Sequence, residues 1–321
     1  MNPILLLGAG FSHNWGGWLA NEAFEYLLGV PTLDEQGRRL LWDHKTEGFE
    51  AALSALQKIG GASLELMEDA VRQMFQDMNR GFFADRADFE FVNETGLNSV
   101  CQFLGRFDAI FTLNQDLLLE LGYCRSLPQS ISTRRTWSGF AFPGMTPRVG
   151  NPMSAEARFA GGWCPDPAGI QDPNAHTQPI YKLHGSSNWV DASGQRMLVM
   201  GGDKTASING SSVLAAYAAE FERRLNLPDS RLVVIGYGFG DNHINMALDR
   251  AAQAGGLRTF IVDPAGADAP DPNRGRPMMI KPRGPQNAVQ GSIAGASRRP
   301  LSRIFGGDSI ERDKVLRFLM P

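Results

Sequence analysis

Two side chains, Asn114 and His184, bring an amide and an imidazole to the ends of two aliphatic segments. An asparagine offers two donors and an acceptor, so Asn114 can hold a hydroxyl group and a water molecule beside a reacting carbon. An imidazole titrates near neutrality, so we expect His184 to act as a base on a hydroxyl or on water. The pair is therefore suited to hold a poised nucleophile.

A glycine-rich turn, Gly8-Ala9-Gly10-Phe11-Ser12, follows the first aliphatic run. Such glycines let backbone N–H groups approach a pyrophosphate, and a following helix adds its dipole. The dinucleotide fingerprint is incomplete, because His13 stands at the third glycine position and no acidic residue ends a second strand about 20 residues later. This departure argues against a conventional hydride-transfer dehydrogenase, and a plain tight turn is an equal alternative.

The elements that must position these residues are short, continuous aliphatic runs that alternate with helical patterns. Such runs indicate a parallel sheet covered on both faces, a Rossmann-like α/β fold. The predicted strands are Ile4–Leu7, Ala109–Leu113, Ile180–Leu183, Leu232–Ile235 and Thr259–Val262, with Met197–Met200 as a further candidate. Ligands of such sheets bind at the carboxyl ends of the strands. Those ends carry nearly all the unusual residues: Gly8 to Ser12, Asn114 to Asp116, His184 to Ser186, Gly236 to Asp241, and Asp263.

Helices are predicted from apolar residues spaced three and four apart. One such face, which is rich in methionine, favours a core position over a cofactor contact. The helical positions are Leu64, Met67, Val71, Met74 and Met78; Leu117 to Leu121; Leu214, Tyr217, Phe221 and Leu225; Ile244, Leu248 and Ala251; and Glu311 to Leu319.

We expect one catalytic domain over residues 1–321 that carries three additions. A helical lobe is inserted over residues 14–105, and an irregular insertion rich in Pro, Gly, Ser and Asn occupies residues 128–179. Residues 264–303 form a Pro/Gly-rich basic segment, predicted to be a mobile, solvated loop.

Composition excludes several classes of protein. The apolar fraction of 43%, the charged fraction of 20% and the net charge of −3 are ordinary for a globular protein and give no global reason to expect nucleic-acid or membrane binding. Cys101, Cys124 and Cys164 lie far apart without a C-x-x-C pair, which argues against a structural zinc site. Sparse cysteine and the lack of a signal-peptide pattern predict a cytoplasmic location.

Taken together, the motifs are similar to those of the sirtuin-like NAD-binding family, and more narrowly to the bacterial sirtuin-like domains of anti-phage defence systems. The matching segments are Gly8 to Ser12, Thr112 to Asp116, Lys182 to Ser186, and Ile235 to Tyr237 with Asp241. Their order and spacing hold from residue 4 to about residue 263. Two departures stand out. The four-cysteine zinc module of protein-deacylating sirtuins is missing, and Gln115 and Gly238 replace the Tyr and Ser of the defence-type pattern.

The resemblance implies that Asn114 and His184 carry the reaction, with NAD⁺ as substrate and no metal. Loss of nicotinamide expels a neutral group through an oxocarbenium-like transition state, so positioning and a shielded pocket matter more than a general acid. The expected NAD⁺-binding residues are Gly8, Ala9, Gly10, Phe11, Ser12, Asp116, Gly185, Gly236, Tyr237, Asp241 and Asp263.

Simpler interpretations of single residues remain open. Asn114 can be a turn former, and His184 can be a core histidine. Asp241 stands before a predicted helix, so an N-cap role is favoured over ligand contact. Asp263 can contact the adenosine ribose or simply end a strand.

The activity expected from the resemblance is hydrolysis of NAD⁺ that depletes the cell during phage infection. The family implies a helicase-like ATPase or a short Argonaute as partner, and we also expect a homo-oligomer. One alternative is a non-catalytic sensor of NAD⁺ or ADP-ribose. Others are an NAD-dependent protein deacylase, and a nucleic-acid-binding subunit that uses the basic loop.

Overall fold

The computed structural model describes residues 1–84, 91, 99–127, 129–130, 136–148, 162–171, 173–271, 273–274 and 287–320. Its centre is a seven-stranded sheet in the order β13-β12-β11-β1-β2-β8-β5, in which each neighbouring pair is parallel. The strands are β1 (Asn2–Leu7), β2 (Ala109–Thr112), β5 (Gly139–Ala141), β8 (Thr177–Lys182), β11 (Ser230–Ile235), β12 (Leu257–Val262) and β13 (Ile293–Ser297).

The predicted α/β class is confirmed, and the aliphatic runs become the five central strands β12, β11, β1, β2 and β8. Their burial explains the pattern, since every residue of β2 and β11 is buried. The strand after β1, β2, pairs with it on one side, whereas β11, much later in the chain, pairs with it on the other side. The direction in which strands are added therefore reverses at β1. This change of direction opens a crevice at the carboxyl ends of the strands, where ligands of such sheets bind.

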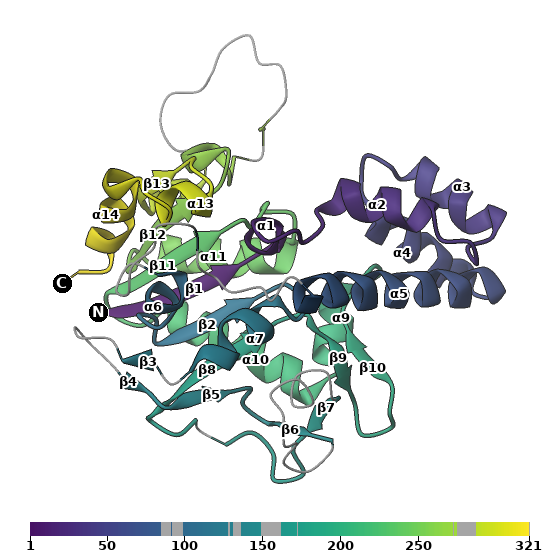
Figure 1. Cartoon of the computed structure of the whole chain (residues 1–321), viewed down its shortest axis with the longest axis horizontal. Coiled ribbons are helices and arrows are strands. Elements are labelled where there is room, and N and C mark those ends of the chain that lie inside the picture. Colours follow the sequence, from purple (N-terminus) through teal and green to yellow (C-terminus); the bar gives the residue numbers. More distant parts are fainter. Residues whose placement is uncertain are drawn as a thin grey trace.

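Helices lie on both sides of this sheet (Figure 1). Ring contacts place Phe103 of α6 against Phe305, which follows α13, and Phe260 of β12 against Phe318 of α14. Helices α10 and α11 pack together and contact β8, β11 and β12. The helices are α1 (Ala9–His13), α2 (Ala20–Leu28), α3 (Glu35–Asp43), α4 (Phe49–Ile59), α5 (Ala62–Ala84), α6 (Val100–Leu104), α7 (Leu118–Gly122), α9 (Lys204–Asn209), α10 (Ser212–Leu225), α11 (Asn242–Gln253), α12 (Ala288–Gly291), α13 (Leu301–Ile304) and α14 (Ser309–Phe318), with 3₁₀ turns η2 (Cys124–Ser126) and η3 (Gly266–Asp268).

Helices α2 to α5 form a lobe that projects from one end of the sheet (Figure 1). The lobe has a core of its own, in which Leu27, Leu56, Met67 and Val71 are buried apart from the main core. The methionine face of α5 is a core face, as predicted. Helix α6 lies inside the range 14–105 that we assigned to the lobe, yet it packs in the main core; residues 85–90 and 92–98 of that range lie outside the described residues.

A second, four-stranded sheet, β10-β9-β7-β6, flanks the first. Its strands are β6 (Met145–Pro147), β7 (Trp163–Pro165), β9 (Gly185–Val190) and β10 (Arg196–Leu198), and β3 (Gln129–Ser130) with β4 (Thr136–Trp137) forms a separate pair. The candidate strand Met197–Met200 is thus shifted to β10, which pairs with β9 antiparallel instead of extending the main sheet. Residues 149–161 of the irregular insertion lie outside the described residues.

The prediction of a loop over residues 264–303 is wrong in part, because β13 adds a parallel strand to β12 there. Its sequence, IAGAS, has no aliphatic run. Phe260 accounts for the glycine of this strand, because a Cβ on Gly295 would lie 2.6 Å from the Phe260 ring. The loop's residues 275–286 lie outside the described residues.

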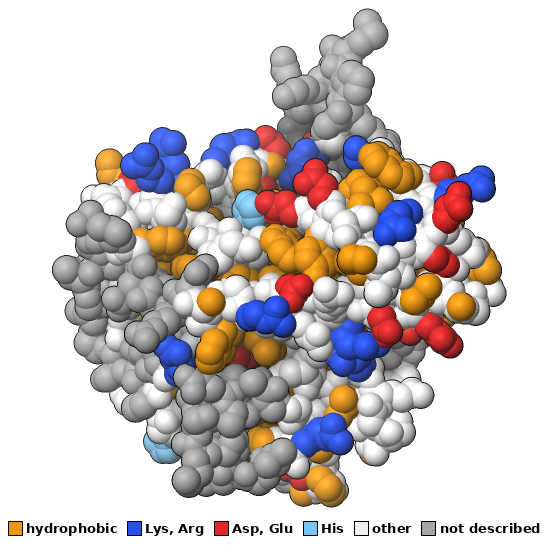
Figure 2. Space-filling view, turned by 45° about the vertical axis from the view of Figure 1, so that its right-hand side comes forward, with side chains coloured by type: hydrophobic (Ala, Val, Ile, Leu, Met, Phe, Trp, Pro, Cys, Tyr) orange, Lys and Arg blue, Asp and Glu red, His pale blue; other side chains and the backbone are white. Residues whose placement is uncertain are grey.

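The face that carries the lobe shows apolar side chains in a band across its middle, with acidic and basic groups interspersed around them (Figure 2). No helix in the described part of the chain is long and apolar enough to cross a bilayer.

Candidate functional site

A cavity of about 1010 Å³ lies between the carboxyl ends of the strands and the helical lobe. Its sheet wall is lined by Gly8, Asn114, His184 and Gly236, and its lobe wall by apolar side chains such as Phe75. The predicted site residues that line it are Gly8, Ala9, Gly10, Asn114, Asp116, His184, Gly236, Tyr237, Asp241 and Asp263. Phe11, Ser12 and Gly185 do not line it; Phe11 and Ser12 are buried behind the wall and act through packing and hydrogen bonds.

Two turns touch backbone to backbone at the centre of the sheet wall. Gly10 N donates to Gly236 O at 2.9 Å, and Gly8 N donates to Ile235 O. A Cβ on Gly8 would lie 2.6 Å from Gly236 O, and one on Gly10 would lie 2.7 Å from Gly236 Cα. Gly236 itself has φ +61°, a conformation that other residues rarely adopt. These glycines are therefore required by the close crossing of the two turns.

Asn114 is held by a hydrogen-bonded chain behind the cavity wall. Its Nδ2 donates to Gly8 O at 3.0 Å and to Ser12 Oγ at 2.9 Å. Ser12 Oγ in turn donates to Asp116 Oδ2 at 2.9 Å. Both amide hydrogens of Asn114 are thereby used, so the group left to meet a ligand is its carbonyl Oδ1, which accepts hydrogen bonds. Asp116 orients this chain and also accepts from Leu118 N.

A buried ion pair underlies this chain. Lys182 Nζ donates to Glu120 Oε1 and to the backbone oxygen of Asp116, each at 2.6 Å. Burial raises the pKa of both Asp116 and Glu120, and the Lys182 ammonium opposes that rise. Because Lys182 ends β8 and Glu120 lies in α7, the ion pair fixes the helix after Asn114 to the strand before His184.

His184 lies in the turn between β8 and β9 with 3% of its surface exposed. Burial lowers the pKa of His184 to about 3, and the Asp241 carboxylate only partly opposes this. The expectation that His184 titrates near neutrality is therefore wrong. The imidazole is therefore neutral at physiological pH. It can form hydrogen bonds with a ligand, but it is a weak base.

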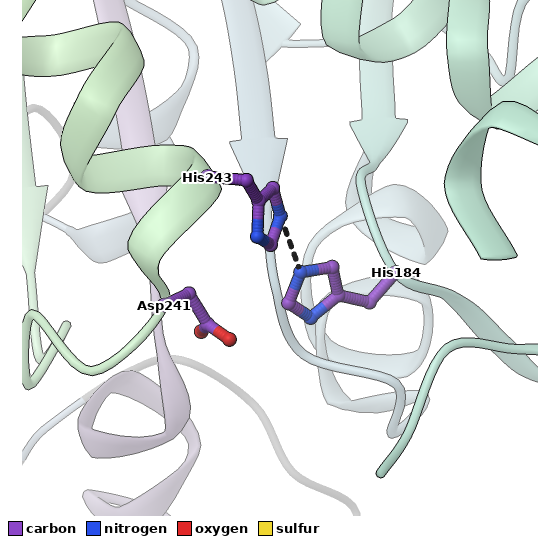
Figure 3. A group of neighbouring side chains, drawn as sticks. All are labelled: His184, Asp241 and His243. Atoms are coloured by element: carbon purple, nitrogen blue, oxygen red, sulfur yellow. Dashed lines mark hydrogen bonds between the residues drawn. The ribbon is translucent and has the colours of Figure 1, made fainter. Parts of the chain in front are cut away.

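His243 and Asp241 are the neighbours of His184 on the other side (Figure 3). His184 Nε2 lies 3.1 Å from His243 Nε2, so one of the two nitrogens carries a proton and donates it to the other. Asp241 stands at the N-cap position of α11, but its side chain makes no capping hydrogen bond. The favoured N-cap role for Asp241 is therefore wrong, and its carboxylate lies with the two histidines instead.

Lys204 joins this cluster to the helical lobe. Its Nζ lies 2.6 Å from Asp241 Oδ1 and 2.6 Å from Glu50 Oε2 of α4. The two carboxylates keep the pKa of Lys204 raised even though burial acts the other way and is the largest single influence. Sequence reasoning missed Lys204 and Glu50 because they come from segments far apart in the chain without a shared motif. His243 is next but one to the predicted Asp241, but no local pattern links it to His184.

Gln115, which stands where the defence-type pattern has Tyr, stabilises the His184 turn. Its Nε2 donates to His184 O at 3.2 Å and to Val199 O at 2.8 Å. Gly185 completes the turn with φ +73°, where a Cβ would collide with the backbone oxygen of Met197. Gln115 and Gly185 therefore act on the backbone around His184.

Tyr237 and Asp263 also line the cavity. The Tyr237 hydroxyl bonds to Asp241 O and to Asn245 Oδ1, so only its ring is free for packing. Asp263 follows β12 and accepts from Ala265 N at 2.8 Å, while Arg274 lies 3.6 Å from its Oδ1. Asp263 thus both ends the strand and lines the cavity.

Comparison with known families places these elements in context. A family model described as a SIR2-like domain matches residues 108–280, more than half of the chain. The match begins just before β2 and ends before β13, so it includes Asn114, His184 and Asp241 but not the Gly8–Gly10 turn. No curated protein matches the chain.

Proposed function

This chain belongs to the SIR2-like family, whose domains are in general NAD-dependent enzymes, and from that premise we propose that it hydrolyses NAD⁺ to nicotinamide and ADP-ribose. The observation that carries the proposal is that Asn114 and His184, which follow different strands, line one cavity between the sheet and the lobe. The cavity volume of about 1010 Å³ is at the upper end of the range for small-molecule sites, as a dinucleotide requires.

The glycine turns suit the diphosphate of this substrate. Gly8, Gly10 and Gly236 line the cavity with backbone alone, while their missing Cβ positions face the crossing turn. Asp263, at the end of β12, offers a carboxylate to an adenosine ribose. In this arrangement the nicotinamide ribose lies toward Asn114 and His184.

The reaction transfers the ribose carbon from nicotinamide to water and releases a proton. Nicotinamide leaves as a neutral molecule from a cationic glycoside, so its departure needs no acid. The Asn114 Oδ1 can accept a hydrogen bond from the attacking water and orient its lone pair toward the ribose carbon. The apolar lobe wall shields the oxocarbenium-like transition state from bulk water.

His184 acts in this scheme as a neutral hydrogen-bonding group. With its pKa lowered to about 3 by burial, it positions a ribose hydroxyl, and the released proton passes to solvent. Its contribution is therefore the geometry of the bound ribose.

The test is NAD⁺ turnover by the purified chain, with nicotinamide and ADP-ribose quantified. We expect Asn114→Ala and His184→Ala each to lower kcat by at least about 100-fold, near 2.7 kcal/mol. His176→Ala, at an exposed histidine away from the cavity, serves as the matched control. Equal turnover in all four proteins contradicts the proposed roles. NAD⁺ loss only with an acylated peptide indicates a deacylase, and nucleotide binding without turnover indicates a sensor.

We further propose that NAD⁺ hydrolysis serves anti-phage defence with a protein partner, a helicase-like ATPase or a short Argonaute, as the motif resemblance implies. The measurement is cellular NAD⁺ after phage infection in bacteria that express the chain with the genes beside it. We expect NAD⁺ to fall with the wild type and to persist with Asn114→Ala. A wild-type culture that keeps its NAD⁺ and dies of infection contradicts the defence role.

A further inference from the structure

His184, Asp241 and His243 form a cluster whose capacity to bind a metal ion is not used in NAD⁺ hydrolysis. Each offers one ligand atom, and these atoms lie within 4.8 Å of one another (Figure 3). Two imidazoles and one carboxylate are a ligand set that binds Zn²⁺ and similar divalent transition-metal ions. His184 borders the main cavity, and His243 borders a neighbouring cavity of about 630 Å³, so the cluster lies between two open volumes.

The spacing of the two imidazoles suits a shared metal ion. Two imidazole nitrogens on one tetrahedral Zn²⁺, at about 2.0–2.1 Å each, lie roughly 3.3 Å apart. The Nε2 atoms of His184 and His243 lie 3.1 Å apart, so a small rotation of the rings admits the ion between them. At that separation at least one nitrogen already presents a lone pair to the other.

We propose that His184, Asp241 and His243 bind a divalent transition-metal ion of the Zn²⁺ class, with water from the cavity as a further ligand. A bound metal fixes the His184 imidazole and places a positive charge beside the oxocarbenium-like transition state, so binding inhibits the enzyme. The inhibitory consequence rests on the proposed NAD⁺ hydrolysis; the binding does not.

Lys204 sets the strength of this site. Its ammonium lies 2.6 Å from Asp241 Oδ1 and competes with the metal for the carboxylate. Glu50 holds Lys204 from the lobe side at 2.6 Å. Metal affinity is therefore moderated by a cation that the lobe holds in place, and loss of that cation tightens binding.

The experiment uses Co²⁺ as the probe, because its visible absorption reports low-coordinate N/O ligation without any need for activity. Tag-free full-length protein is titrated with Co²⁺, and Zn²⁺ is then added to displace it. We expect an absorption band that saturates with one metal per chain in the wild type. In His243→Ala, Co²⁺ binding should be lost or its affinity should fall at least about tenfold. The same is expected for His243→Gln, which keeps a polar side chain.

Two further variants make the result specific. His176→Ala, at an exposed histidine outside the cluster, keeps the wild-type titration, and Lys204→Met binds Co²⁺ more tightly than the wild type. No absorption band in the wild type, or an unchanged titration in both His243 variants, overturns the proposal. Zn²⁺ inhibition of NAD⁺ cleavage is measured separately, so a chain that binds Co²⁺ but does not cleave NAD⁺ overturns only the proposed function.

Discussion

The two walls of the cavity are built in different ways. The sheet wall is fixed by backbone contacts at Gly8, Gly10 and Gly236 and by a buried polar chain behind Asn114. Most of the lobe wall belongs to a separate apolar core, although the C-terminal part of α5 packs into the main core, and a few polar bridges add to this contact. In one of these, Asn79 Oδ1 accepts from Leu117 N at 2.8 Å. The difference indicates that the sheet wall is rigid and that the lobe wall is more independent of it. We therefore expect substitutions in the sheet wall to lower the free energy of unfolding far more than substitutions in the lobe.

The largest effect is expected at the crossing of the glycine turns. Gly236→Ala places a Cβ 2.5 Å from Gly10 Cα at a residue with φ +61°, so one of the two turns must move. We expect a loss of at least about 4 kcal/mol in the free energy of unfolding, measured by urea denaturation. Gly238→Ala, where a Cβ would meet nothing within 4 Å, is the control and should lose less than about 1 kcal/mol. Equal losses in the two variants would remove the basis for a rigid sheet wall.

The next effect concerns the ion pair beneath Asn114. Lys182→Met leaves the Glu120 carboxyl buried without its counter-charge. We expect the free energy of unfolding, measured by urea denaturation at neutral pH, to fall by about 3 kcal/mol. Lys182→Met with Glu120→Gln should recover part of that loss, because the Glu120 charge is removed together with its counter-charge.

The loss in Lys182→Met should depend on pH in a defined direction. Burial already raises the pKa of Glu120 above its unfolded value, and removal of Lys182 raises it further. A carboxyl whose folded pKa is raised favours folding below its unfolded pKa and loses that benefit as pH rises through the folded pKa. The variant is therefore expected to be closer to the wild type at pH 5 than at pH 8 in unfolding experiments. A difference between variant and wild type that is the same at pH 5 and pH 8 would show that Glu120 stays ionised.

The sheet wall was largely predictable from sequence and the cluster around His184 was not, for physical reasons. Continuous aliphatic runs and glycine turns are local patterns, so five strands and the crossing glycines were found. Strand β13 was missed because Gly295 packs beneath Phe260 and leaves no apolar run. His243 meets His184, and Lys204 meets Asp241, only through the tertiary fold, and the low pKa of His184 is caused by burial, which no local motif reports.

A smaller effect is expected from Ser12, which positions Asn114 without lining the cavity. Ser12→Ala removes the acceptor of one Asn114 amide hydrogen and the donor to Asp116. We expect kcat for NAD⁺ cleavage to fall about tenfold, near 1.4 kcal/mol, with KM nearly unchanged, because the amide is misoriented while the cavity keeps its shape. Steady-state kinetics separates the two constants. A rise in KM alone would assign Ser12 to the shape of the binding site instead of to the orientation of Asn114.

The smallest effect is expected in the lobe, at Asp34, whose carboxylate accepts from Gly37 N at the start of α3 and from Ser63 of α5. Asp34→Asn should cost about 1 kcal/mol or less, since the group is only partly buried and the loss is local to the lobe. The hydrogen bond from Ser63, the largest influence, lowers the pKa of Asp34, so its stabilising contribution is present above the unfolded pKa and is lost as pH falls through the folded pKa. The difference between wild type and variant in thermal unfolding should therefore shrink below about pH 4. If Asp34→Asn instead lowered the stability of the whole chain as strongly as Gly236→Ala, the lobe would be part of the rigid wall, and the contrast between the two walls would fail.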